Sequence, residues 1–316
     1  MMSEPERRLV QRLIDETDIT EAQALELIAL LAANLVQRHE ARSNVASPTA
    51  IENISAHSKL VGYPNGFLMA QAPSSNILIR KLQTISELAR SDIGILGNIS
   101  IQEKEYQANE DILREGDKPS LSFVVLDGLI GSTTLTGEGK RQISSFFVPG
   151  DTPDLHGLHL SVMDCTFTPL MPALVGFMRH DALRTICDQH PSITRVFWRS
   201  TVIDAAIYRE WVTNVGRRDA YSRIAHIFCE LIVRLRSVGR IEDHVAYLPI
   251  TQAALGDAVG LSTVHVNRVL QDLRRDGLIS TVGSRFQASD WAGLVRAADF
   301  DSTYLHQRAA QTGPGF

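Results

Sequence analysis

The chain has 316 residues, of which 44% are hydrophobic and 21% charged, and its formal net charge is -5. This length favours two compact domains plus an extension over a single domain. The negative charge excludes a global attraction to nucleic acid, so any DNA contact needs a local basic patch. The three cysteines, Cys165, Cys187 and Cys229, form no CxxC pair, which argues against a disulfide framework or an iron–sulfur cluster.

Targeting and membrane signals are missing from the sequence pattern. Charged residues fill the start, from Glu4 to Arg8, where a signal peptide would be apolar. The most apolar stretch, 24–36, contains Glu26 and Asn34 and is too short to cross a bilayer. We therefore expect a cytoplasmic protein with no membrane partner.

The N-terminal part shows helical periodicity followed by a change in composition. Apolar residues recur at helical spacing within 5–41, with a break at 18–20, which predicts a helical module over 1–45. Ser, Asn, Pro and Gly then become frequent, which predicts a linker over 46–75. Neither segment indicates a function.

A β-rich region follows a short helix predicted near 78–88. Glycine turns separate the apolar runs 122–126, 143–148 and 173–178. Short strands joined by glycine turns at a spacing of about ten residues are typical of a sandwich or roll. The sequence thus predicts a β-roll domain over 76–190.

A long helix is predicted from Ser192 to Asn214, with an interruption at 215–218 that predicts a hinge; helix and hinge together cover 191–216. One side of this helix carries a wide apolar stripe. The stripe consists of Ile193, Val196, Phe197, Ser200, Ile203, Ile207 and Trp211. Periodicity alone leaves two interpretations open, packing against the β-domain or a two-stranded dimer seam.

The most informative stretch is 248–279, within a C-terminal domain predicted over 217–295 and followed by a tail over 296–316. Thr251 can cap a short helix that Gly260 ends in a left-handed turn, and Ser262 can cap the next helix. This is the turn chemistry of a helix-turn-helix, and the run from Leu278 to Phe286 predicts a two-stranded wing.

The outer face of the second helix carries side chains suited to DNA. Arg268 can bind a guanine, Asn267 a base or a phosphate, and Val264 a thymine methyl group. Residues near a helix N-terminus can bind phosphates. The full set of DNA-binding candidates is Thr251, Ser262, Thr263, Val264, His265, Asn267, Arg268, Gln271 and Arg285. A helical hairpin without a DNA role is the alternative, and the wing argues against it.

Residues 76–290 resemble the Crp/Fnr family of bacterial transcription regulators. The segments 114–117, 124–128 and 146–151 resemble parts of a cyclic-nucleotide-binding-like β-roll. The segment 193–214 resembles the family's long helix, and 251–279 resembles its helix-turn-helix. It implies an α+β fold and a homodimer on a palindromic double-stranded DNA site that acts with RNA polymerase. It also favours the dimer-seam interpretation of the apolar stripe.

The loop after Pro149-Gly150-Asp151 departs from the family pattern. The family's Gly-Glu pair is replaced by Asp154-Leu155, and no Arg or Lys occurs between Arg141 and Arg179. A buried cyclic phosphate without a cationic partner is costly. We therefore expect no binding of cyclic AMP in the family manner, and the cofactor remains unknown.

The same loop is crowded with other polar side chains. The effector-pocket candidates are Asp151, Asp154, His156, His159 and Cys165. Their spacing fits no metal template, so no metal is predicted, although a metal or haem sensor acting through protein partners stays open as an alternative. No P-loop, G-x-S-x-G or H-E-x-x-H motif indicates an enzyme. A further alternative is a family member that needs no effector and is controlled by its own abundance, because the phosphate-binding residues of the family are missing.

Overall fold

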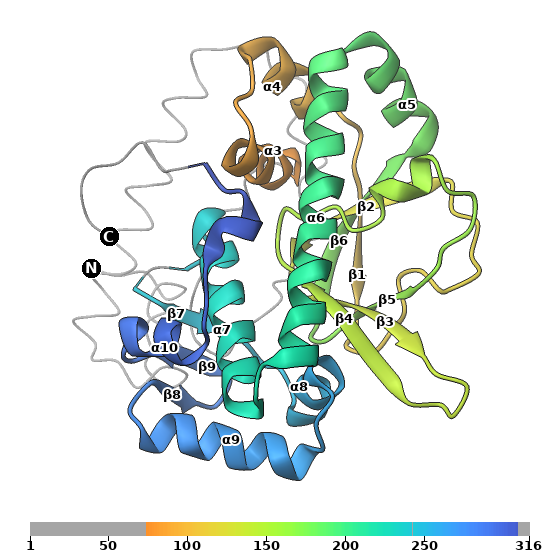
Figure 1. Ribbon diagram of the computed structural model, residues 1–316. Helices are drawn as coiled ribbons and strands as arrows, with labels where there is room; N and C mark the ends of the chain where they lie inside the picture. Colours follow the sequence, from red (N-terminus) through yellow and green to blue (C-terminus); the bar gives the residue numbers. More distant parts are fainter. Residues whose placement is uncertain (1–73, 242, 309–316) are drawn as a thin grey trace, which may run out of the picture. The chain divides into compact units, whose positions relative to one another are not determined.

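A computed structural model describes residues 74–241 and 243–308 (Figure 1). The helical module predicted over 1–45 lies outside the described residues. So does the linker predicted over 46–75, except for its last two residues, which begin a helix. The described residues form a mixed helix and sheet fold with a β-roll, a long helix and a helix-turn-helix, as the α+β prediction required.

The first part of the described chain is a roll of two antiparallel sheets. The helices α3 (Ser74–Ile85) and α4 (Arg90–Gly97) precede it, and α5 (His180–Gln189) follows it. One sheet has the order β1-β6-β2, with β1 (Gln102–Tyr106), β6 (Ala173–Arg179) and β2 (Leu121–Asp127). The other has the order β4-β3-β5, with β4 (Arg141–Phe147), β3 (Ile130–Leu135) and β5 (Thr166–Pro169). A short 3-10 helix, η1 (Leu155–Leu158), lies in the loop between β4 and β5.

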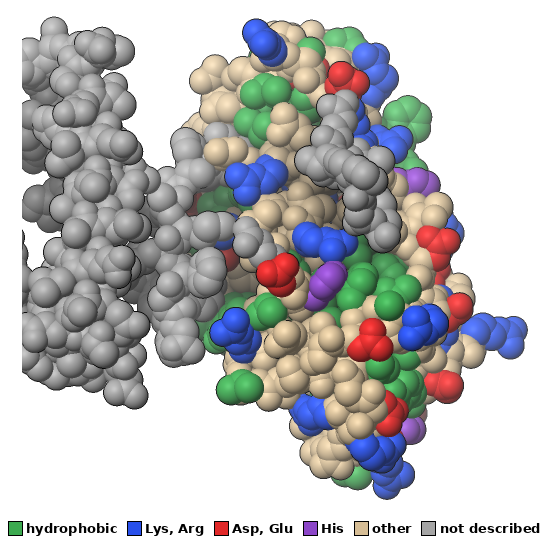
Figure 2. Space-filling model, turned by 90° about the vertical axis from the view of Figure 1, so that its left-hand side faces the viewer, with side chains coloured by type: hydrophobic (Ala, Val, Ile, Leu, Met, Phe, Trp, Pro, Cys, Tyr) green, Lys and Arg blue, Asp and Glu red, His purple; other side chains and the backbone are tan. Residues whose placement is uncertain are grey.

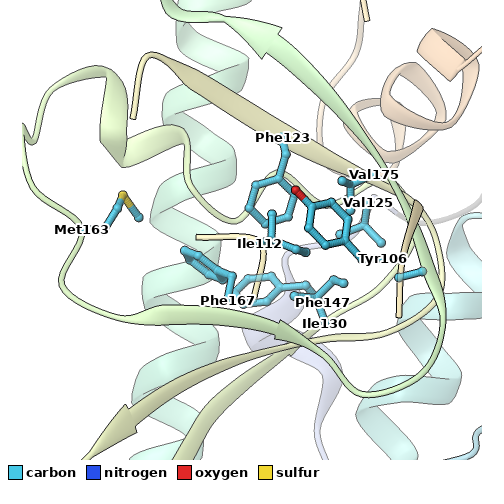
Figure 3. Packing of buried hydrophobic residues seen from close by; sticks show 10 residues of the cluster. Tyr106, Ile112, Phe123, Val125, Ile130, Phe147, Met163, Phe167 and Val175 are labelled. Carbon is cyan, nitrogen blue, oxygen red and sulfur yellow. The ribbon is translucent and has the colours of Figure 1, made fainter. Parts of the chain in front are cut away.

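Aromatic side chains fill the interior of the roll (Figure 3). The ring of Phe167 packs edge-on against Phe123 at 5.6 Å and against Phe147 at 5.8 Å between centroids. Successive side chains of a strand face opposite sides. Phe147 therefore points into the roll, while Phe146 packs outside it, 5.2 Å from the ring of Trp211 on the long helix.

The long helix α6 (Pro191–Arg217) runs beside the roll (Figure 1). Pro191 stands at its first turn, where a missing N–H costs nothing. The helix continues through Gly216 and ends at Arg217, so the break in the chain falls at Arg218 and Asp219, at the end of the predicted hinge 215–218.

The apolar stripe of α6 is interior packing within one chain. Its seven residues are between 0% and 7% exposed, and these are Ile193, Val196, Phe197, Ser200, Ile203, Ile207 and Trp211. These side chains are covered within their own chain and leave little surface for a partner. Their burial favours packing against the β-domain over the expected dimer seam on this face of the helix.

The C-terminal domain begins with α7 (Ala220–Ser237). Its remaining elements are β7 (Val245–Tyr247), α8 (Gln252–Val259), α9 (Thr263–Arg275), β8 (Ile279–Val282), β9 (Arg285–Ala288), α10 (Trp291–Ala297) and η2 (Ser302–Leu305). The three strands form one antiparallel sheet in the order β7-β9-β8. Phe286 of β9 is buried and stacks on Phe228 of α7 at 4.3 Å, which joins the wing to the helices.

The described part of the C-terminal tail, 296–308, is packed against the rest of the chain. Tyr304 of η2 stacks on the ring of His226, and its hydroxyl donates to Glu230 at 2.8 Å. The backbone N–H of Arg308 donates to the carbonyl oxygen of Thr84 at 2.7 Å. This tail therefore connects the C-terminal domain with the end of α3, which its polar sequence did not indicate.

Candidate DNA-binding site

The helix-turn-helix forms through local capping, as its sequence predicts. Thr251 Oγ1 accepts the N–H of Ala254 at 3.1 Å, and Ser262 Oγ accepts the N–H of His265 at 3.3 Å. Gly260 adopts a φ of 68°, a left-handed conformation that favours glycine. These contacts fix where α8 ends and where α9 begins.

Gly256 is a further requirement of the turn that the sequence analysis missed. A Cβ atom at this position would lie 2.5 Å from the carbonyl oxygen of Leu261. No side chain fits there, because the obstacle is backbone. The signal was a glycine inside a helix, where it costs about 1 kcal/mol relative to alanine unless packing requires it.

The helix α9 separates a buried face from an exposed one. Its inner side chains, Val266, Val269, Leu270 and Leu273, are at most 6% exposed. Its outer face presents the side chains predicted to bind DNA, and all of them are exposed: Thr263, Val264, His265, Asn267, Arg268 and Gln271. The capping residues Thr251 and Ser262 are exposed beside them. The structure thus brings these candidates together on one surface.

The arginines of α9 differ in how they are paired. Arg275 forms an ion pair with Asp272 at 2.7 Å, and Arg274 donates to Thr281 of the wing at 3.0 Å. Within the described residues, the guanidinium of Arg268 makes no hydrogen bond or ion pair. Figure 2, which views the left-hand side of Figure 1, shows Lys and Arg side chains at the lower end of the molecule, the end where α9 lies in Figure 1. Arg268 is therefore the cation of α9 that is available to a ligand.

The wing lies next to this surface. Arg285, on β9, is exposed, and Val282 at the end of β8 is 79% exposed. Arg285 pairs in register with Val282 on one side and with Tyr247 on the other. The wing thus adds a second cation to the exposed surface formed by α9.

The effector-pocket candidates are not brought together around a cavity. Asp154 is fully buried, where its Oδ1 accepts the N–H of Phe123 at 3.0 Å, and burial raises its pKa to about 8. His156 is half-buried, with Nε2 3.9 Å from Asp164, and His159 is exposed. Cys165 is half-buried beside the roll core, and burial raises the pKa of its thiol to about 11.

Asp151 has a structural role that the sequence analysis did not anticipate. Its carboxylate lies 2.7 Å from Lys81 Nζ and 2.7 Å from Arg234 Nη2, and it accepts the N–H of Val148 at 2.7 Å. Burial alone would raise its pKa, but the two cations outweigh burial and hold the pKa below its usual value. Both carboxylate oxygens are therefore already bound within the chain, which favours a structural role over contact with an effector.

Two further findings limit the chemistry of the described part of the chain. No group of three His, Cys, Asp or Glu side chains there is arranged to hold a metal ion. None of the described helices is long and apolar enough to cross a membrane.

Comparison with known proteins identifies both domains. Residues 103–190 match the family model for the cyclic nucleotide-binding domain, and residues 222–297 match the model for the Crp-like helix-turn-helix domain. Together the two matches cover more than half of the chain.

Curated relatives and solved structures agree with these matches. The transcriptional activator protein FnrL of Cereibacter sphaeroides is 26% identical over 63% of this chain and 81% of its own length. The anaerobic regulatory protein of Haemophilus influenzae is 23% identical over 69% and 84%. The structure of FixK2 from Bradyrhizobium japonicum matches with a TM-score of 0.58 and 22% identity, covering 62% of this chain and 96% of FixK2. Both curated relatives are regulators rather than enzymes.

Proposed function

Because the chain belongs to the Crp/Fnr family of DNA-binding transcription regulators, we propose that it acts as a homodimer on a palindromic operator. The observation that carries the proposal is the exposed outer face of α9 with Arg268, which has no partner among the described residues. In a two-fold dimer the two α9 helices would enter the major groove at half-sites about one helical turn apart.

Each exposed side chain of α9 has a role in this proposal. Arg268 donates two hydrogen bonds to a guanine, Asn267 bonds an adenine or a phosphate, and Val264 contacts a thymine methyl group. The phosphate contacts come from side chains at the rim of the surface. These are Thr251, Ser262, Thr263, His265, Gln271 and Arg285.

The dimer seam lies on the exposed side of α6, opposite to the stripe expected from periodicity. Trp198 is 69% exposed, Val202 49% and Val212 74%. With Ala205 and Arg209, both exposed, these residues recur at alternating spacings of four and three. That repeat is the one a two-stranded coiled coil needs. Apolar side chains of this size are rarely left exposed in a row on a helix that has no partner.

The sensor domain works without a cyclic nucleotide in this proposal. The interior of the roll is occupied by Phe123, Phe147 and Phe167. No Arg or Lys stands between Arg141 and Arg179 to neutralise a phosphate. A nucleotide would have to displace packed rings and bury an unpaired anion, and both steps cost free energy. We further propose that the protein acts in the cytoplasm and contacts RNA polymerase at its promoters.

Selection of sheared genomic DNA by the purified protein, with no ligand added, tests this function. We expect enrichment of a palindrome. We expect Arg268→Ala to weaken the enrichment and to lose the base preference at one position of each half-site, while Arg275→Ala, whose cation is already paired with Asp272, retains both. Absence of any enriched sequence, both alone and with cell extract added, would contradict the proposal. Calorimetry with cyclic AMP and cyclic GMP is the second test, and micromolar binding of either would refute effector-free action.

A further inference from the structure

A chain of buried charges connects the sensor domain with the DNA-binding domain. Lys81 of α3 pairs with Asp151, which follows β4, and Asp151 pairs with Arg234 of α7. Arg234 also donates to Glu230 Oε1, and each of these three contacts is 2.7 Å long. The four side chains are at most 11% exposed. Water screens such pairs little, so their geometry is held more firmly than that of a surface ion pair.

The other end of this network reaches the long helix and the C-terminal tail. Glu230 Oε2 accepts the indole N–H of Trp211 at 3.0 Å and the hydroxyl of Tyr304 at 2.8 Å. Every carboxylate oxygen of Asp151 and Glu230 therefore has a partner. A buried polar network with its acceptors satisfied specifies one arrangement of the elements that it joins.

The network spans the one break between the two domains. The α6 helix ends at Arg217, and α7 begins after Asp219, which caps it. On its own, this short connection would allow α7 to swivel against α6. Asp151 binds Arg234 of α7, and Trp211 of α6 binds Glu230 of α7. The connection therefore cannot turn unless these buried contacts are broken.

We propose that Asp151 is a positioning residue for DNA binding, which sets the orientation of the DNA-binding domain through Arg234 and so sets the spacing of half-sites that the dimer accepts. The inference rests on the proposed function, because half-site spacing has meaning only for a dimer. The separation of two recognition helices fixes operator spacing when both are rigidly attached to the dimer helix. Arg141 with Asp257 at 2.7 Å and Arg240 with the carbonyl oxygen of Leu126 at 2.6 Å also join the two domains, so loss of the Asp151 charge loosens the attachment and lets the dimer accept other spacings.

The test compares Asp151→Asn with Asp154→Asn. Asparagine at 151 keeps the acceptor for the N–H of Val148 but loses the charge that holds Arg234. Asp204 has a pKa raised to about 7 by burial and by the charge of Asp151, so it can replace part of the lost charge and let the variant fold. Asp154 is a matched control, since it is buried in the same turn and accepts from Phe123 of the sensor.

The measurement is the affinity, at fixed salt and pH, for the selected palindrome with its spacer changed by one and two base pairs, and for a single half-site. We expect wild type and Asp154→Asn to lose affinity steeply with each change of spacer. We expect Asp151→Asn to bind the operator with the best spacer on the order of tenfold more weakly than wild type. Its affinity for the operators with changed spacers should fall only slightly further. Half-site affinity stays unchanged, because α9 is not altered.

Arg234→Lys provides a second variant, since lysine keeps the charge but cannot bind Asp151 and Glu230 with one planar fork. This variant replaces Asp151→Asn in the test if Asp151→Asn fails to fold. We expect it to accept the same wider range of spacer lengths. A variant that keeps the narrow spacing preference of the wild type would overturn the inference and leave the proposed function intact. A wild-type protein with no spacing preference would overturn both.

Discussion

Replacement of Arg268 by alanine distinguishes a sequence-specific contact to a base from a sequence-independent contact to the phosphate backbone. Arg268 is exposed and unpaired in the described part of the chain, so its removal should leave the fold unchanged. A bidentate contact between arginine and guanine contributes about 1–3 kcal/mol to the discrimination of one base.

The size of the effect follows from two-fold symmetry. A dimer loses the contact in both half-sites, and sites this far apart contribute additively. The expected loss is therefore about 2–6 kcal/mol, which corresponds to about 30-fold to about 10⁴-fold in affinity at 1.4 kcal/mol for each factor of ten.

Fluorescence anisotropy with the selected operator measures this loss, and a set of operators with one symmetric base pair changed locates it. For Arg268→Ala we expect one position to become indifferent to its base, while discrimination elsewhere is kept. Arg275→Ala is the control on the same helix, since Arg275 is already paired with Asp272. If Arg268→Ala weakens binding to all sequences equally and reduces the salt dependence, Arg268 contacts a phosphate and the reasoning is wrong.

Three further predictions follow from the packing and the charges. Val202→Glu places a charge in the proposed seam of both protomers, so light scattering at micromolar concentration should detect a monomer. A stable dimer of this variant would refute the proposed seam. Phe147→Ala empties part of the roll, where Phe147 is 1% exposed, and should lower the free energy of unfolding by about 3–5 kcal/mol in urea titrations; a loss below about 1 kcal/mol would show that the roll is not tightly packed. The pKa of Asp154 is raised to about 8 by burial, so its contribution to stability is fully present below the unfolded pKa of 3.8 and is lost as pH rises towards 8. Asp154→Asn should therefore gain stability relative to wild type between pH 5 and pH 8, and parallel unfolding midpoints across that range would contradict this.

The helix-turn-helix could be predicted because its determinants are local. Thr251, Gly260 and Ser262 act within three or four residues of their own positions, as caps or as a turn. Such signals do not depend on which other segments pack nearby. Gly256 escaped notice because its constraint comes from the backbone of Leu261 in the folded turn.

The dimer seam that we propose lies on a different face of α6 from the one expected from the sequence, because periodicity reports apolarity and not the identity of the partner. The most apolar stripe, which contains Trp211, is the one that its own chain covers. The side that is free for a second copy carries Trp198 and Val202 among polar residues, a weaker pattern. For a helix packed against its own domain, the seam of a dimer is expected on the less apolar of two stripes.

The role of Asp151 could not be predicted, because its partners are far away in the sequence. Arg234 lies 83 positions along the chain and Lys81 comes from a helix before the roll. A charged residue after a Pro-Gly turn is equally consistent with a ligand contact and with an ion pair. Only the fold, which buries Glu230 and Arg234 on α7, decides between them.

The filled roll and the buried network point to the same mode of regulation. An effector that reorients the DNA-binding domain needs space in the sensor, and it needs the connection between α6 and α7 to be able to turn. Phe147 and its neighbours occupy the interior of the sensor, and in our proposal the pairing of Asp151 with Arg234 restricts the connection. A ligand shifts a conformational equilibrium only as far as its affinities for the two states differ. In the function that we propose, a chain held in one state by its own contacts therefore responds to its concentration, through dimer formation and operator occupancy, rather than to a small molecule in the roll.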